Sequence, residues 1–290
     1  EGVSVGIYPP IIQIDASPPA IVNTQISIQN ESDQTINYGI FLMPFKAANT
    51  KNGEPEFDKT LLESYKEFFK GVQVSDKNKV ISEIKLAPNQ TKELTLRIAV
   101  PKGMQAKDYY FSVLFITQES QGLKENSFAG ARAGIAANVL LTLGPKSKSS
   151  GYIREFSAPH FVTRGPVDFT LNLANTSPHY ITIEGNVLIK NIFNQTVGSL
   201  DLLPVNLLSN SERFIESEGN KKDVPRLYWN EAFLLGIYTA DLTVSLSPEG
   251  PIVKRSLTFI AIPLELILGL VIGFILIIGI IKRVKRKQIE

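Results

Sequence analysis

Residues 26–32 read Ile-Ser-Ile-Gln-Asn-Glu-Ser, and residues 171–177 read Leu-Asn-Leu-Ala-Asn-Thr-Ser. In both stretches apolar residues alternate with polar or small ones, and an Asn is followed two residues later by a Ser. Such alternation is typical of a β-strand with one buried face, and Asn and Ser are typical of the turn that ends it. We therefore expect two related β-rich units, one around each stretch.

Two further pairs of segments extend this internal repeat in the same order. Leu86–Leu94 resembles Leu208–Phe214, because both carry an Asn among small polar residues before a strand. Asp108–Val113 then resembles Gly236–Asp241, where the next strand begins. Short alternating strands separated by Asn, Gly, Pro and Ser are typical of antiparallel sandwiches. The sequence therefore predicts an all-β fold with two tandem immunoglobulin-like β-sandwiches.

The boundary between the two sandwiches is predicted at Gly144–Gly151, a polar segment that carries Gly, Pro and Ser. We place the first sandwich at residues 1–145 and the second at residues 152–258. Residues 58–70 break the strand pattern, because their apolar residues recur at helical spacing. We predict a helical insertion there, which either caps the edge of the sandwich or presents a ledge to a partner.

The C-terminal end predicts a membrane anchor. Residues 259–281 are apolar apart from Glu265, and about 20 apolar residues are enough to span a bilayer as a helix. A basic cluster follows at Lys282, Arg283, Lys285, Arg286 and Lys287. Because positive residues mark the cytoplasmic side, we expect a type I single-pass protein of the cell membrane. Its two sandwiches would be extracellular, and residues 282–290 would form a basic cytoplasmic tail.

Two other features belong to this picture. Gly269 and Gly273 form a Gly-x-x-x-Gly pattern within the predicted span, which would let two such helices pack closely as a homo-oligomer. The chain begins with Glu1 rather than Met, so we expect that a signal peptide has already been removed or that the chain was trimmed.

The composition argues against most enzyme classes. There is no Cys, and the only two His residues, His160 and His179, each lie beside a Pro in a turn-like context. No phosphate loop, nucleophile elbow or metalloprotease motif occurs, so we expect no catalytic residues, no metal site and no cofactor. The net charge of +2 comes largely from the C-terminal basic cluster, which gives no footprint for nucleic acid.

Four Asn-x-Ser/Thr sites, at Asn30, Asn89, Asn175 and Asn194, allow two interpretations. They are acceptors for N-glycosylation if the cell glycosylates, and otherwise they are ordinary turn residues. The sequence leaves both open.

Short motifs give the chain a resemblance to a known family. Ala47–Gly53 is similar to the Ala-x-Thr-Asn-x-x-Gly segment of WxL-interacting proteins, which are surface proteins of Gram-positive bacteria. Leu86–Asn89, Val100–Lys102 and Tyr109–Phe115 also resemble the peptidoglycan-binding domain of that family, although Tyr109-Tyr110 replaces its Gly-Gly.

The second unit resembles the companion host-binding domain of the same family, with Leu173–Asn175 and Gly236–Tyr238 in matching order. The resemblance implies binding to peptidoglycan, association with WxL-type surface proteins and a role in cell adhesion. The family also ends in one membrane helix and a basic tail.

We expect the binding surface of the first unit at Asn49, Thr50, Lys51, Asn52 and Gly53. This segment lies in a long insertion, and its amides and hydroxyl suit hydrogen bonds to a sugar or a peptide. The same residue types build turns, so the insertion is either a binding site or a structural loop.

Two function hypotheses follow. The first is a non-enzymatic, membrane-anchored protein that holds a cell-wall polymer or partner surface proteins on the outer face of the cell. The second is an assembly chaperone or scaffold for surface fibres that recognises a partner at a strand edge. The stretch Ile7–Ile14 favours the second, since it resembles the first strand of pilus chaperones and exposed strands can accept a partner strand. Its paired prolines also blunt a sheet edge, which is the structural alternative.

Overall fold

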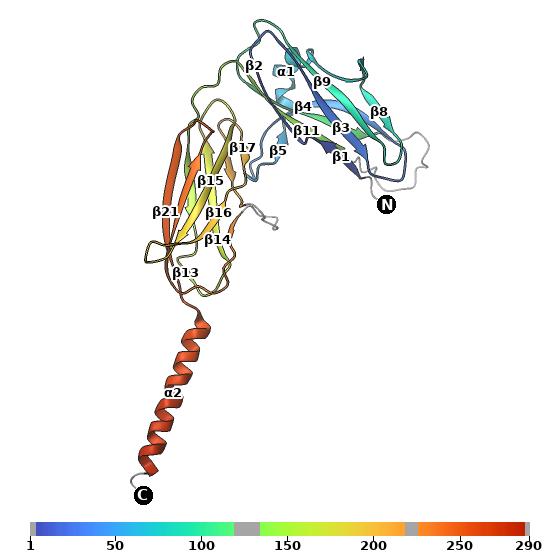
Figure 1. The fold of residues 1–290 in the computed structure, drawn as a ribbon. Helices are drawn as coiled ribbons and strands as arrows, with labels where there is room; N and C mark the ends of the chain where they lie inside the picture. The colour runs from blue at the N-terminus through green and yellow to red at the C-terminus, as the bar shows by residue number, and fades with distance from the viewer. Residues whose placement is uncertain (1–3, 119–133, 218–225, 288–290) are drawn as a thin grey trace. The chain divides into compact units, whose positions relative to one another are not determined.

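The computed structural model describes residues 4–118, 134–217 and 226–287, which are mostly β-strand (Figure 1). The chain divides into two compact units, each containing two β-sheets. Unit 1 consists of Glu1–Thr50, Glu54–Lys148 and Pro178–Tyr180. Unit 2 consists of Lys51–Gly53, Ser149–Ser177 and Ile181–Glu290.

The first sheet of unit 1 has the strand order β1-β3-β9-β6-β7. Its strands are β1 (Val5–Tyr8), β3 (Ala20–Asn30), β9 (Thr91–Val100), β6 (Val72–Asp76) and β7 (Lys79–Val80). The second sheet has the order β2-β11-β10-β4-β5, and β8 also pairs with β4. Its strands are β2 (Ile11–Ala16), β11 (Gly134–Leu143), β10 (Asp108–Thr117), β4 (Ile36–Ala47), β5 (Pro55–Phe57) and β8 (Glu83–Leu86).

The core of unit 1 lies between these sheets and follows the alternation of the sequence. Leu94, Leu96 and Ile98 of β9 are fully buried, and β3 places Ile26 opposite Leu94. Because side chains of a strand alternate between its two faces, every second residue of β9 reaches the core. β10 contributes buried aromatic residues from the other sheet, including Phe111.

The stretch Ile7–Ile14 changes sheets at its two prolines. β1 pairs antiparallel with β3 in the first sheet, whereas β2 pairs parallel with β11 in the second. Pro9 and Pro10 separate the two strands and have no backbone N–H to donate to either sheet. The carbonyl of Pro10 still accepts a hydrogen bond from the Asn138 N–H at 2.9 Å, where the pairing with β11 begins.

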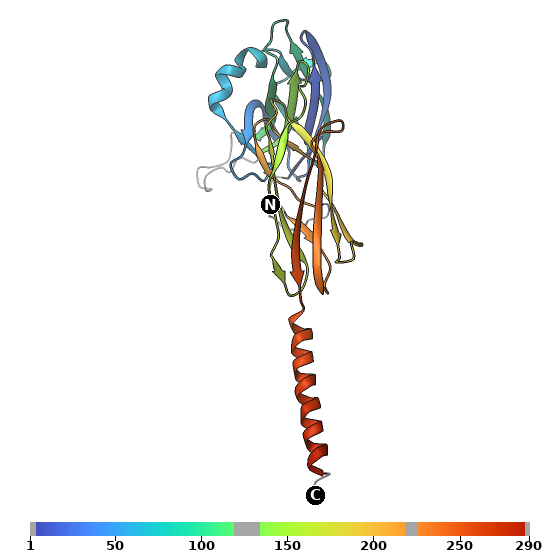
Figure 2. The same ribbon diagram turned by 90° about the vertical axis from the view of Figure 1, so that its left-hand side faces the viewer.

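The segment 58–70 contains a short 3-10 turn, η1 (Lys59–Leu61), followed by α1 (Leu62–Phe69) at one side of the strands (Figure 2). Asp58 caps the turn by accepting a hydrogen bond from the Thr60 N–H at 2.9 Å. Tyr65 and Phe68 are buried, and both rings contact Tyr109 of β10. The Tyr65 hydroxyl also accepts a hydrogen bond from the Tyr110 N–H at 3.0 Å. This helix face therefore adds to the core of unit 1.

Tyr65 gives unit 1 an alkaline pH dependence. Burial raises the pKa of Tyr65 from 10.0 to about 12, because the phenolate would be poorly solvated. The stabilisation is therefore complete below pH 10 and is lost as the pH rises from 10 to about 12. We expect the free energy of unfolding to fall across this window by about 1–2 kcal/mol more in the wild type than in Tyr65→Phe. Urea titrations at a series of pH values measure the difference, and parallel curves for the two proteins would contradict it.

Unit 2 repeats the two-sheet arrangement. One sheet has the order β12-β14-β18, with β19 also paired to β14. Its strands are β12 (Gly151–Ser157), β14 (Val167–Asn175), β18 (Glu212–Phe214) and β19 (Leu227–Trp229). The other sheet has the order β13-β21-β20-β15-β16, with β17 paired to β15. Its strands are β13 (Phe161–Val162), β21 (Ile252–Ala261), β20 (Gly236–Ser245), β15 (Ile181–Lys190), β16 (Thr196–Asp201) and β17 (Val205–Leu207).

The repeated Asn has the same role in both units. In unit 1 the Asn30 amide donates to the carbonyls of Leu86 and Ala87 at 3.2 and 3.1 Å, and its oxygen accepts from the Ser32 N–H at 3.1 Å. In unit 2 the Asn175 amide donates in the same way to two consecutive carbonyls. These belong to Leu207 and Leu208, at 3.0 and 2.9 Å.

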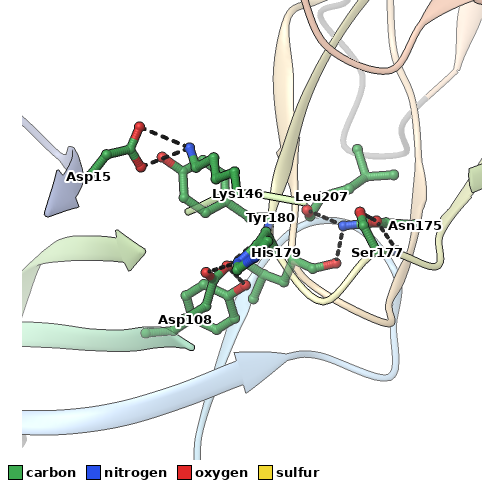
Figure 3. Close-up of polar contacts among 10 residues, drawn as sticks. Asp15, Asp108, Lys146, Asn175, Ser177, His179, Tyr180 and Leu207 are labelled. Atoms are coloured by element: carbon green, nitrogen blue, oxygen red, sulfur yellow. Dashed lines mark hydrogen bonds and ion pairs between the residues drawn. The ribbon is translucent and has the colours of Figure 1, made fainter. Parts of the chain in front are cut away.

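The Ser177 N–H donates to the Asn175 oxygen at 2.9 Å, which completes the match (Figure 3). Each buried Asn thus ties the end of one strand to a distant turn. We name these two arrangements the Asn corners, centred on Asn30 and Asn175. A glycan at either residue would replace an amide hydrogen that the corner uses. Asn89 and Asn194 instead occupy turns with positive φ.

The predicted transmembrane helix is wrong. β21 extends to Ala261 and buries Phe259 and Ala261 in unit 2, so the first residues of the predicted span at 259–281 belong to the sandwich. α2 (Leu264–Lys287) begins only after Pro263. Over the residues that the structure describes, no helix is both long enough and apolar enough to cross a membrane.

The features that depended on this span are corrected with it. The predicted fold class is wrong in its C-terminal transmembrane part, and the predicted single-pass membrane localisation is wrong with it. Peptidoglycan binding, which rested on the family resemblance and not on the span, is not supported either. Gly269 and Gly273 border open space, because an added Cβ would meet no atom within 4 Å. The side chains used to orient the chain, Lys282, Arg283, Lys285, Arg286 and Lys287, lie outside the described part of the structure.

Candidate functional site

The predicted binding segment Asn49–Gly53 lies in the turn between β4 and β5. The turn is closed by a hydrogen bond from the Ala48 N–H to the Glu54 carbonyl at 3.1 Å. Its residues 51–53 belong to unit 2. There the Lys51 ammonium lies 2.6 Å from a Glu212 carboxylate oxygen, and the Phe214 N–H donates to the Lys51 carbonyl at 2.7 Å. Lys51 therefore continues the hydrogen bonding of β18.

Gly53 is required by its surroundings. Its φ of +88° lies in the region that favours Gly, and a Cβ there would fall 2.1 Å from the Arg213 guanidinium carbon. Arg213 is half-buried, and desolvation lowers its pKa. The hydrogen bond from Lys51 lowers the pKa of Glu212. Lys51 and Gly53 thus have structural roles within unit 2, and ligand binding by this segment stays a prediction.

A second polar cluster surrounds Asp108 in unit 1 (Figure 3). The buried Asp108 carboxylate lies 2.8 Å from His179 Nδ1. It also accepts a hydrogen bond from the Tyr180 N–H at 2.7 Å. A further hydrogen bond to this carboxylate comes from the Tyr110 hydroxyl. Lys146 lies 4.5 Å from the centre of the Tyr180 ring. These contacts hold Pro178–Tyr180 within unit 1.

The sequence assigned His179 to a turn, and its partner Asp108 could not be found from spacing because the two are far apart along the chain. The cluster offers a structural role rather than a catalytic one, since the carboxylate already accepts from several donors. In the described ranges, no group of three or more His, Asp or Glu side chains is arranged to hold a metal ion.

The strongest candidate binding site is an open strand edge on β11. β11 pairs with β10 along residues 134–142, but β2 covers its other edge only from Asn138 onward. The Asn138 N–H points to β2, and backbone groups alternate in direction along a strand. Ala136 and Gly134 therefore direct their N–H and C=O groups to the uncovered edge. No described strand is paired with that edge at residues 134–137, although β1 approaches β11 from the other sheet. We name this segment the open edge.

The sheet face beside the open edge is apolar. Val113 of β10 is buried in the core, so the neighbouring Leu114 points to the outer face of the sheet. Register places Leu114 between Phe41 of β4 and Ala136 of β11. Phe41 is 48% exposed, and Leu114 and Ala136 are half-buried. The row Phe41–Leu114–Ala136 therefore leads across the outer face to the open edge, and we name it the apolar row.

The chemistry available at this place is binding by strand addition. The unpaired N–H and C=O groups of an edge form backbone hydrogen bonds with an incoming strand, and alternate side chains of that strand lie on each face. A strand placed beside Ala136 would extend the apolar row by one position. Sequence reasoning identified an exposed strand at Ile7–Ile14 but did not locate the open edge on β11.

Comparisons with known proteins were informative only at the level of solved structures. No protein-family model matches the sequence, and no curated protein matches it, so the resemblance to WxL-interacting proteins stays a prediction. Among solved structures, the chain is similar to the E. coli chaperone DraB, with 9% identity and a TM-score of 0.40. That match covers 88% of this chain and 98% of the chaperone.

Two other structures give similar values. A chain of the Salmonella enterica SafA pilin in complex with the SafB chaperone matches at 11% identity and a TM-score of 0.39, over 89% of this chain and 98% of its own length. The Pseudomonas aeruginosa CupB2 chaperone matches at 8% identity and a TM-score of 0.36, over 88% and 99%. Scores below 0.5 at such low identity do not tell what this chain binds.

Proposed function

We propose that this chain is a non-enzymatic assembly chaperone or scaffold that binds protein subunits of surface fibres by strand-edge recognition. The observation that carries the proposal is the open edge of β11, where backbone groups of Gly134 and Ala136 have no strand partner in the described structure. An edge left open inside an otherwise paired sheet is a template for a partner strand.

The surroundings of the open edge support a protein partner over a sugar. The apolar row consists of Phe41, Leu114 and Ala136, which suit aliphatic side chains of a strand rather than the hydroxyls of a polymer. The stretch Ile7–Ile14 resembles the first strand of pilus chaperones. Because it forms β1 in one sheet and β2 in the other, residues 134–137 of β11 have no strand partner on this edge.

The partner segment follows from this geometry. It is an extended peptide of at least four residues, long enough to face residues 134–137. Every second side chain of the peptide would lie beside the apolar row, so these positions would be apolar. Such a segment is typical of a fibre subunit whose own sheet is incomplete until assembly.

A pair of synthetic peptides tests the proposal. One peptide of ten residues alternates Val or Ile with Thr or Lys, and its control has the same composition with the apolar residues grouped together. We expect the alternating peptide to bind at least tenfold more tightly by fluorescence anisotropy, because only its pattern presents apolar groups to one face. Equal affinity for the two peptides would contradict strand-edge recognition.

A further inference from the structure

Unit 2 contains a hollow in which two aromatic residues of the core lie beside two exposed ones. Its volume is about 310 Å³, and it is lined by Trp229 and Tyr238 together with Phe193 and Phe233. Phe193 is 75% exposed and Phe233 is 59% exposed, although large apolar side chains are normally turned inward. Glu231 also lines the hollow and is exposed. We name this site the aromatic hollow.

The hollow is built by strands of both sheets of unit 2. β19 ends at Trp229, and the indole reaches across β16 because Gly198 has no side chain there. The Trp229 and Tyr238 rings meet edge to face, with centres 5.3 Å apart. Tyr238 is itself stacked on Phe259 at 5.4 Å, so two of the four aromatic walls are fixed by packing.

The third wall is also held in place. Phe193 lies in the turn between β15 and β16, where its N–H donates to the Asn191 side-chain oxygen at 3.0 Å. The Gln195 N–H donates to the same oxygen at 3.1 Å. This turn fixes the backbone of Phe193 while leaving its ring exposed beside the hollow. Phe193 therefore adds an exposed aromatic ring to the apolar patch around the hollow, and contiguous exposed apolar patches mark interaction sites.

The charge of the lining residues indicates which kind of ligand the hollow would bind. Glu231 is the charged residue of the lining, and the described lining residues include no Lys, Arg or His. Among the described residues, no ion pair involves Glu231. The faces of aromatic rings carry partial negative charge and attract cations, most strongly for Trp. A carboxylate beside four aromatic residues therefore complements a compact organic cation.

We propose that the aromatic hollow binds an alkylammonium group, whether it comes from a Lys side chain of a protein or from a free quaternary amine. The volume of about 310 Å³ is sufficient for either group. The site lies in unit 2 and shares no residue with the open edge of unit 1, so it stands independently of the proposed function.

The single Trp of the chain makes the test direct, because Trp229 is itself part of the lining. Choline is titrated against the full chain while Trp emission is followed, and 3,3-dimethyl-1-butanol serves as the uncharged probe of the same shape. We expect choline to bind at least tenfold more tightly than the alcohol. The proposal is overturned if choline binds no more tightly than the alcohol and Nα-acetyl-lysine amide also gives no saturable change.

Variants and a second probe complete the experiment. Phe193→Ala and Glu231→Gln should each weaken binding of the tighter cation at least fivefold, because each removes one attractive group from an exposed position. Phe57→Ala and Glu249→Gln, which alter an exposed ring in unit 1 and a carboxylate outside the hollow, should leave affinity unchanged. Tighter binding of Nα-acetyl-lysine amide, which keeps its side-chain ammonium group, than of choline identifies a Lys side chain of a protein as the ligand. The reverse order identifies a free quaternary amine. Binding that survives both hollow variants overturns the site.

Discussion

Asn175→Ala should lower the free energy of unfolding of unit 2 by about 3 kcal/mol. The Asn175 amide satisfies the carbonyls of Leu207 and Leu208, and its oxygen satisfies the Ser177 N–H. Removing the side chain leaves these groups without their partner. Each buried polar group that loses its hydrogen bond costs about 1–3 kcal/mol. Part of this cost is recovered where water can enter.

Urea unfolding followed by the emission of Trp229 measures this effect, because the only Trp of the chain lies in unit 2. Asn186→Ala is the matched control, since Asn186 is half-buried on β15 and no hydrogen bond of its side chain is found among the described residues. We expect the control to change stability by no more than about 0.5 kcal/mol. A similar loss in both variants would mean that the Asn corner of unit 2 adds nothing specific.

Ala136→Pro should abolish binding of the alternating peptide while leaving unit 1 folded. The Ala136 N–H points to the open edge, so proline removes a donor that only an added strand would use. Proline is tolerated in a strand where its missing N–H faces away from the neighbouring strand. We expect at least a tenfold loss of affinity by anisotropy, with a far-ultraviolet circular dichroism spectrum close to that of the wild type.

The neighbouring residue gives the matched comparison. The Ala137 N–H points to β10, and Ala137 is fully buried, so Ala137→Pro breaks a hydrogen bond of the sheet. We expect this variant to lose about 3 kcal/mol or more of stability. If Ala136→Pro unfolds the chain as readily as Ala137→Pro, the edge at residue 136 is not open.

The internal repeat could be predicted because it depends on the alternation of apolar and polar residues within short segments. Alternation in residues 26–32 and 171–177 specifies strands, and the Asn in each stretch is visible in the sequence. The role of Asn30 could not be predicted, because the carbonyls it satisfies lie at Leu86 and Ala87 and are brought near only by folding. Local residues indicate a turn, whereas the Asn corner is a long-range arrangement.

The error at the C-terminal end has a similar origin. An apolar run such as 259–281 fits both a membrane helix and the end of a buried strand followed by a helix. Residues 252–261 carry the alternation of a strand, with Phe259 and Ala261 buried, and this pattern overlaps the apolar run. The prediction used only the length and apolar composition of the run, and it therefore assigned all of residues 259–281 to one helix.

The candidate site depended on register, which the sequence does not reveal. β11 reads Gly-Ile-Ala-Ala-Asn-Val-Leu-Leu-Thr-Leu, an apolar strand with no sign that residues 134–137 lack a strand partner on one edge. The open edge exists because β2 begins its pairing at Asn138. The segment Asn49–Gly53 was predicted from its amides, but the ion pair of Lys51 with Glu212 joins residues far apart in sequence.

Amide hydrogen exchange at Ala136 tests the central claim most directly. In the free chain, we expect the Ala136 amide to exchange quickly and the Ala137 amide slowly, because only the second donates to β10. Saturation with the alternating peptide should slow exchange at Ala136 at least tenfold and leave Ala137 nearly unchanged, since the added strand supplies the missing acceptor. If the peptide binds while the Ala136 amide exchanges at its free rate, the partner does not add to the open edge, and the proposed function is contradicted.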